Sequence, residues 1–162
     1  MRKCDIDCSL MCKIQGNIFE KSLEYLNCSS PLFIKKYMMG EDALSMDRLE
    51  FLNGTKSDIQ VLQDMKDTEY GSNKYSGYDL FWMGYIYRYW SYVYEIDSKQ
   101  LYKLFPGTEL IKYAAYSEHD PQYTINLIIE ENNLEMPGDK DLLTKSQKII
   151  SNQIETYKLS TN

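Results

Sequence analysis

The chain has little with which to perform catalysis: among its 162 residues there is a single histidine, His119. Nucleophilic catalysis by Ser or Cys generally needs a histidine base beside the nucleophile. The sequence also lacks a glycine-rich phosphate loop, an H-E-x-x-H zinc motif and a paired-carboxylate motif. We therefore expect a protein that is not an enzyme and has no cofactor, with His119 as a solvated turn residue. Catalytic groups that converge from distant parts of the chain stay open as an alternative.

The chain also lacks an excess of positive charge and an uninterrupted apolar run. Eighteen Lys and Arg against 24 Asp and Glu give a net charge of −6, which disfavours nucleic acid and favours a basic protein partner. The most apolar stretch, residues 76–95, contains Asp79 and Arg88, and an Arg at a helix centre costs about 2.5–3.5 kcal/mol in a membrane. Asp5 and Lys13 interrupt any signal-peptide core. We expect a soluble cytoplasmic protein without a membrane partner.

Four cysteines are present, and Cys4, Cys8 and Cys12 recur every four residues. If this segment is helical, the three thiols share one face. Clustered thiolates suit a metal or iron–sulfur site, whereas free cysteines also behave as small apolar side chains. The spacing matches neither paired C-x-x-C ligands nor the common cluster motifs, so no metal site is predicted. Disulfides are not expected in a reducing compartment.

Length and the pattern of helix caps predict one all-α domain, a helical bundle over residues 1–162. Residues 1–16 are expected to be a flexible, cysteine-containing segment before a first helix capped by Asn17. A second helix should begin at Ser30, followed by Pro31, and end at Gly40.

The helical pattern weakens in the middle of the chain and then returns. Within residues 55–74, Ile59, Val61 and Leu62 fit either a short helix or an edge strand, and Gly71-Ser72-Asn73 is expected to be a loop. A third helical piece contains Leu44, Leu49 and Leu52 and should end at Asn53-Gly54. Two later helices are expected from Asp97 or Ser98 to Phe105 and from Thr108 to Tyr116. Another should begin at Asp120-Pro121, and a last one should cover residues 139–160.

The densest aromatic stretch, residues 76–95, is expected to be the central helix of the bundle, because it is apolar or aromatic nearly all round. Ser76 is a good N-cap for it. Its predicted buried side consists of Trp82, Ile86, Tyr89, Trp90 and Val93. A narrow third face consists of Gly84, Arg88, Ser91 and Glu95. On that face, the glycine would permit close approach of a second helix or of a partner.

A specific string runs from Trp82 to Trp90, Trp-Met-Gly-Tyr-Ile-Tyr-Arg-Tyr-Trp, and is followed by Ser98-Lys99, Tyr102-Lys103, Glu109-Leu110, Tyr116 and Asp120-Pro121. Over residues 75–129 this pattern resembles a family of small bacterial proteins labelled antitoxins, the inhibitors in toxin–antitoxin gene pairs. That family carries Tyr-His-Thr-Leu before its Asp-Pro step, where this chain has Tyr116-Ser-Glu-His119. The resemblance implies an intracellular protein whose partner is the cognate toxin encoded beside it, and a homodimer is compatible with it.

The aromatic helix is therefore expected to contribute a protein-binding face as well as core, since Tyr, Trp and Arg are enriched at binding hot spots. The predicted partner-binding residues are Gly84, Tyr87, Arg88, Ser91, Glu95, Tyr116 and His119, with Arg88 at their centre. A ligand or enzyme pocket around Arg88 is one alternative. A DNA-binding autoregulator is another, although neither residues 99–112 nor residues 140–148 concentrate positive charge without nearby acids.

Overall fold

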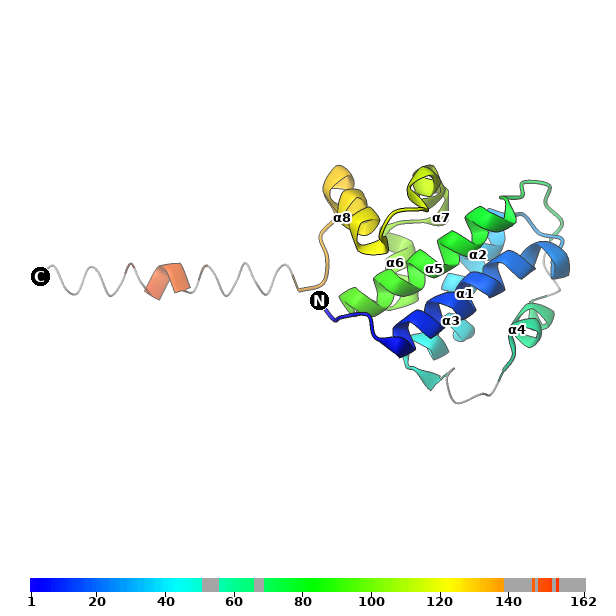
Figure 1. Cartoon of the computed structure of the whole chain (residues 1–162), viewed down its shortest axis with the longest axis horizontal. Helices are drawn as coiled ribbons and strands as arrows, with labels where there is room; N and C mark the ends of the chain where they lie inside the picture. Colours follow the sequence, from blue (N-terminus) through cyan, green and yellow to red (C-terminus); the bar gives the residue numbers. More distant parts are fainter. Residues whose placement is uncertain (51–55, 66–68, 139–146, 148, 153, 155–162) are drawn as a thin grey trace, which may run out of the picture.

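A computed structural model describes residues 1–50, 56–65, 69–138, 147, 149–152 and 154 of the chain. The regular structure within these residues is entirely helical, as the sequence predicts. The main elements are α1 (Ile6–Tyr25), α2 (Ser30–Met38), α3 (Glu41–Asp47), α4 (Asp58–Asp64), α5 (Gly77–Tyr94), α6 (Ser98–Leu104), α7 (Gly107–Leu110), the 3-10 helix η2 (Ile111–Tyr116) and α8 (Pro121–Asn132). Figure 1 shows them gathered around α5.

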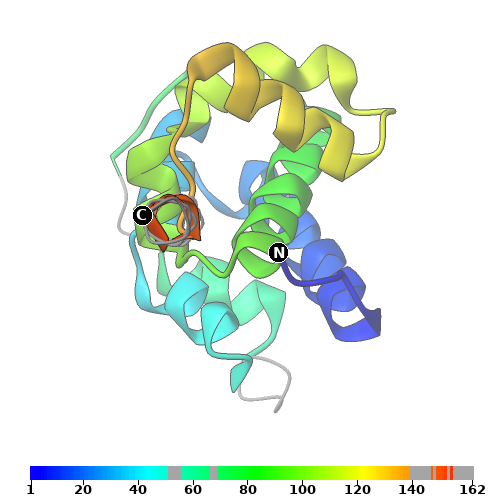
Figure 2. The same ribbon diagram turned by 90° about the vertical axis from the view of Figure 1, so that its left-hand side faces the viewer.

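The bundle is organised around one close pair of antiparallel helices, α1 and α5. They lie side by side in both views (Figures 1 and 2). Two glycines permit this approach. A Cβ atom on Gly16 would lie 2.9 Å from the Phe81 ring, and one on Gly84 would lie 2.6 Å from the carbonyl oxygen of Gln15. Close helix approach, one of the two roles expected for Gly84, is therefore the role that the structure shows.

The remaining helices bury the aromatic side chains that this pair presents. Phe19 of α1 packs edge-on against Phe33 and Tyr37 of α2, with ring centroids 5.1 and 5.2 Å apart. At the other side of α5, Trp90 packs against Phe105, with ring centroids 5.8 Å apart. Figure 2 shows α5 between α1 and the yellow α8. The aromatic helix is thus the centre of the core, as predicted.

Most helix starts follow the predicted local chemistry. The side chains of Ser76, Asp97 and Asp120 each accept a hydrogen bond from a backbone N–H in the first turn of α5, α6 and α8. The second helix has Ser29 rather than Ser30 as its cap, with Pro31 in its first turn. Residues 58–64 form a helix, α4, whose start is a capping box at Ser57.

The prediction for the first helix was wrong. α1 begins at Ile6 and not after Asn17, because Asp5 acts as the N-cap and accepts a hydrogen bond from the Cys8 N–H at 2.9 Å. Residues 6–16, expected to be flexible, form the first half of α1, and Cys8 and Cys12 are fully buried there. Asn17 lies on the exposed side of the same helix, where a polar residue is tolerated.

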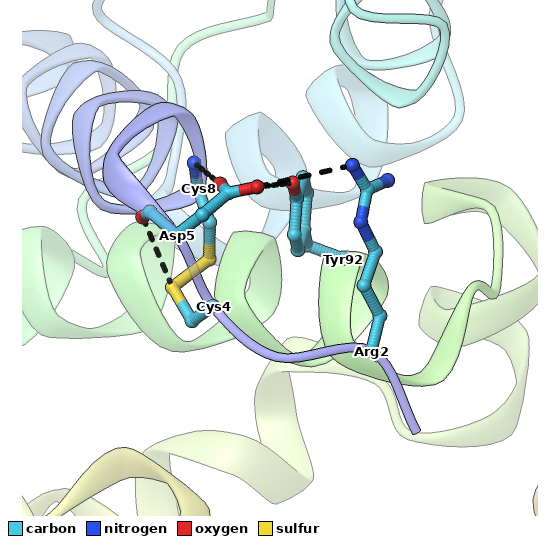
Figure 3. Close-up of a disulfide and its surroundings, with 5 residues drawn as sticks. All are labelled: Arg2, Cys4, Asp5, Cys8 and Tyr92. Atoms are coloured by element: carbon cyan, nitrogen blue, oxygen red, sulfur yellow. Dashed lines mark hydrogen bonds and ion pairs between the residues drawn. A yellow bond between two sulfur atoms is a disulfide. The ribbon is translucent and has the colours of Figure 1, made fainter.

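The structure contains a disulfide between Cys4 and Cys8, which was not expected (Figure 3). The four-residue spacing across a helix start places their Cα atoms 5.3 Å apart, within the range that a disulfide requires. Two of the three regularly spaced thiols are therefore joined to each other. Burial raises the pKa of the third thiol, Cys12, to about 12, so at neutral pH it is not a thiolate that could exchange with the disulfide.

Next to the disulfide, the N-terminal segment is held on the C-terminal end of α5. The guanidinium of Arg2 lies 4.0 Å from the centre of the Tyr92 ring. The backbone N–H of Arg2 donates a hydrogen bond to the Val93 carbonyl at 2.7 Å. The Tyr92 hydroxyl donates to Asp5 at 2.7 Å (Figure 3). The hydrogen bond from Cys8 N–H, together with that from Tyr92, lowers the pKa of the Asp5 carboxyl.

Two predictions lie partly or wholly outside the described residues. In the third helical piece, Leu44 belongs to α3 and Leu49 follows it with a positive φ of 61°, whereas Leu52 and Asn53-Gly54 are not described. Of the helix expected over 139–160, residues 147, 149–152 and 154 are described and are helical. Three isoleucines among them are more than half exposed: Ile149, Ile150 and Ile154.

We predict that Gly84→Ala destabilises the protein by about 1–3 kcal/mol, because the added methyl group overpacks the contact with α1. Without that contact, the same change inside a helix would stabilise by about 1 kcal/mol. Gly77→Ala is the matched control, since its Cβ would meet nothing nearer than Glu20 at 3.5 Å. Urea unfolding of the three proteins measures the difference, and equal midpoints for both variants would contradict the close contact.

The disulfide predicts a specific count of reactive thiols. In denatured protein without reductant, alkylation should modify two of the four cysteines, Cys12 and Cys28, and dithiothreitol should raise the number to four. Intact-protein mass spectrometry counts the added groups. The Cys12→Ser variant should show one modified cysteine before reduction, and four modified cysteines in unreduced wild-type protein would exclude the disulfide.

Candidate functional site

Arg88, the predicted centre of the binding face, is buried and is only 1% exposed. Its Nε and Nη2 atoms donate to the Gln15 side-chain oxygen at 3.0 and 2.9 Å. Nη1 donates to Asp47 at 2.6 Å, and Nη2 also contacts the Ser98 hydroxyl at 2.9 Å. The guanidinium is thus bound by side chains from α1, α3 and α6. We conclude that it holds these helices to α5.

Both oxygens of the Asp47 carboxylate also accept hydrogen bonds. One of its oxygens accepts from Arg88, from the Ser91 hydroxyl at 3.2 Å and from the Ser98 hydroxyl at 2.7 Å. The other accepts from the backbone N–H of Ser98 at 2.8 Å. Gln15 completes the arrangement, because its amide nitrogen donates to the carbonyl oxygen of Gly84 at 3.0 Å. These groups form a buried polar network whose members satisfy one another.

A hollow of about 240 Å³ lies beside this network, lined by Arg2, Met46, Asp47, Leu49, Arg88, Ser91, Tyr92, Glu95, Ile96 and Asp97. It corresponds to the pocket that the alternative hypothesis places around Arg88. A ligand that displaced Asp47 from the guanidinium would leave the Asp47 carboxylate without its ion pair. The hydrogen bonds of Arg88 therefore favour a structural role over a ligand-binding one.

The structure separates the seven predicted partner-binding residues into three groups. Four of them are buried within the bundle: Gly84, Tyr87, Arg88 and Ser91. Tyr87 donates its hydroxyl hydrogen to the Phe105 carbonyl at 2.7 Å. These four are interior side chains and form no surface, because α1, α3 and α6 cover the face that they share. Glu95 is exposed at the C-terminal end of α5.

The other two predicted residues, Tyr116 and His119, lie together at a second hollow near the N-terminal half of α5. This aromatic hollow has a volume of about 290 Å³. Its lining comes from α5, from the segment between η2 and α8, and from the first residue of α8: Tyr78, Phe81, Trp82, Tyr85, Ile86, Ser117, His119 and Pro121. Tyr116 does not line it but packs against His119, with ring centroids 5.5 Å apart.

The exposed aromatic side chains at the aromatic hollow are held in place. Tyr78 is 57% exposed, and its hydroxyl hydrogen-bonds both Glu118 and the Ser117 hydroxyl. His119 is stacked on Tyr123, which is 53% exposed, with an interplanar angle of 21° and ring centroids 5.6 Å apart. Large apolar groups that are both exposed and fixed in position favour binding, because little side-chain entropy is left to lose.

The aromatic hollow does not have the arrangement of a nucleophilic active site. Ser117 and His119 both line it, but the Ser117 hydroxyl is directed to Tyr78, and the His119 ring packs between Tyr116 and Tyr123. In the part of the chain that the structure describes, no group of three His, Cys, Asp or Glu side chains is placed to hold a metal ion. The groups available here for binding are aromatic rings and the carboxylate of Glu118.

The sequence prediction missed Tyr78, Phe81 and Tyr85 as surface residues. They recur at intervals of three and four along α5, which is the spacing of one helix face. Their proximity to residues 117–121 depends on how the turn before α8 folds back, and local periodicity carries no information about that. One signal in the sequence could have indicated this surface. Aromatic residues lie on nearly every side of this helix, so some of them were to be expected at the surface of a small bundle.

Comparison of the chain with protein-family models, with curated proteins and with solved structures gives no match. Among the described helices, none is both long and apolar enough to cross a membrane.

We predict that Arg88→Ala destabilises the protein by about 3–5 kcal/mol, because it leaves Asp47 and Gln15 buried without their partner. Arg48→Ala is the control. It removes an exposed arginine next in sequence to Asp47 and should change the unfolding free energy by less than about 0.5 kcal/mol. In a double-mutant cycle with Asp47→Ala, the two losses should not add. Thermal unfolding measures this, and a fully stable Arg88→Ala protein would contradict a structural role.

Proposed function

We propose that this chain is a non-enzymatic protein-binding module, an antitoxin that neutralises a toxin encoded beside it, and that it binds this partner through the aromatic hollow. The observation that supports a binding role is the set of exposed and fixed aromatic side chains around it, foremost Tyr78, His119 and Tyr123. Tyrosine is among the residues most enriched at hot spots of protein interfaces.

The proposed class of partner follows from the sequence. The string from Trp82 to Trp90 resembles that of antitoxins, and α5, which carries it, also supplies five of the eight residues that line the hollow. In this proposal the string has two roles. Its Arg88 side builds the core network, while Trp82 and Tyr85 on another side line the hollow.

The proposal predicts a stable complex between this chain and the product of the adjacent gene. Co-expression should abolish the toxicity of that product, and the two proteins should elute together in size-exclusion chromatography. Tyr78→Ala removes a lining ring, and Tyr123→Ala removes the ring that stacks on the lining residue His119. Each should weaken binding by about 2 kcal/mol, roughly thirtyfold, as for hot-spot residues. Titration calorimetry measures the dissociation constants.

Tyr70→Ala is the matched control, because Tyr70 is 83% exposed but does not line the hollow. It should leave the affinity unchanged. A neighbour that stays toxic and unbound would contradict the antitoxin proposal. If the chain alone elutes as a dimer that Tyr78→Ala dissociates, the aromatic hollow binds a second copy of the chain instead.

A further inference from the structure

We infer that the aromatic hollow receives a cation, the guanidinium of an arginine side chain from the bound protein. This inference rests on the proposed protein-binding function and specifies the chemistry of that site. Three features of the described residues support it: four aromatic rings in the lining, the Glu118 carboxylate that is bonded to the lining residue Tyr78, and the absence of Lys and Arg from the lining.

The lining is rich in π-systems that attract positive charge. Tyr78, Phe81, Trp82 and Tyr85 all come from successive turns of α5 and border one space. Aromatic faces carry partial negative charge and bind cations within about 6 Å of the ring centroid. The volume of about 290 Å³ is at the lower limit of the 300–1,000 Å³ typical of small-molecule pockets, so one long side chain suits it better than a cofactor.

Two acidic side chains stand beside these rings. Glu118 is exposed and accepts a hydrogen bond from the Tyr78 hydroxyl. Asp120 caps α8, is also exposed, and stands in the chain between the lining residues His119 and Pro121, as Glu118 stands between Ser117 and His119; we call these two acidic residues the rim. The rim is therefore acidic as well as aromatic, and this combination favours a cation over an apolar side chain.

An arginine side chain suits both the aromatic lining and the acidic residues beside it better than a lysine side chain does. A guanidinium is planar and stacks on aromatic rings, and its N–H groups can donate to a carboxylate at the same time. An ammonium group is a strongly hydrated point charge that stacks poorly. A partner with an exposed arginine would also be attracted by the net charge of −6 of this chain.

The first test uses a small probe in place of the partner. N-acetyl-arginine methylamide, titrated into the full chain and followed by NMR, should shift the resonances of Tyr78, Phe81 and Tyr85. The neutral isostere N-acetyl-citrulline methylamide should bind roughly threefold to thirtyfold more weakly. Equal binding of both probes, shifts confined to other residues, or no binding of the arginine probe would overturn the inference.

Charge-removing variants make the test specific to the rim. Glu118→Gln with Asp120→Asn should weaken binding of the arginine probe severalfold and leave citrulline binding unchanged. Both substitutions keep hydrogen-bond acceptors, and Asn remains a good N-cap for α8. Glu131→Gln is the matched control, because Glu131 accepts from the Tyr113 hydroxyl in a similar Tyr–Glu pair that does not line the hollow. An equal effect of the control would overturn the inference.

The complex with the adjacent gene product separates this inference from the proposed function. If the partner binds but the double rim variant and added salt leave its affinity unchanged, the antitoxin proposal stands and the cation site is wrong. If the arginine probe binds at the hollow but the adjacent gene product does not bind, the cation site stands and the partner is wrong. If both are correct, the double variant weakens the complex and reduces its salt dependence.

Discussion

The interaction on which the fold depends is the burial of the Arg88 guanidinium. A charge in the interior is tolerated only if it is paired and hydrogen-bonded. Arg88 meets this condition with Gln15, Asp47 and Ser98, which come from three different helices. Apolar packing is non-directional, but these hydrogen bonds have fixed geometry. The short helices α3 and α6, seven residues each, are marginal alone, and the shared network fixes where they lie against α5.

This constraint divides the long aromatic helix into two parts with different roles. Its C-terminal half is largely covered, because the partners of Arg88 come from α1, α3 and α6. Its N-terminal half carries Tyr78, Phe81 and Tyr85, which remain partly or largely open beside the turn before α8. Since Gly84 presses the same helix against α1, the backbone that carries these aromatics is fixed from behind. The hollow is therefore preformed, and binding of the proposed partner would cost little free energy for ordering it.

The sequence predicted what depends on nearby residues and missed what depends on distant ones. The caps Ser76, Asp97 and Asp120 act within three residues, so their helix starts could be predicted. The start of α1 was missed because Asp5 competes with Asn17 as a cap, and the sequence does not rank them. The burial of most of the predicted binding face was missed for another reason. Periodicity shows that Gly84, Arg88 and Ser91 share one side of α5 but not that other helices cover it, and the acceptors of Arg88 on Gln15 and Asp47 are 73 and 41 residues away.

The buried ion pair also affects the charge that a partner meets. Arg88 and Asp47 neutralise each other inside the bundle, so together they contribute nothing to the net charge of −6. The cation that the aromatic string presents in the sequence is thereby absent from the surface of α5, while Glu118 and Asp120 remain exposed at the aromatic hollow. Arg88 of this chain is thus part of the core. The aromatic hollow, with exposed carboxylates beside it, is complementary to the arginine that we propose a partner supplies.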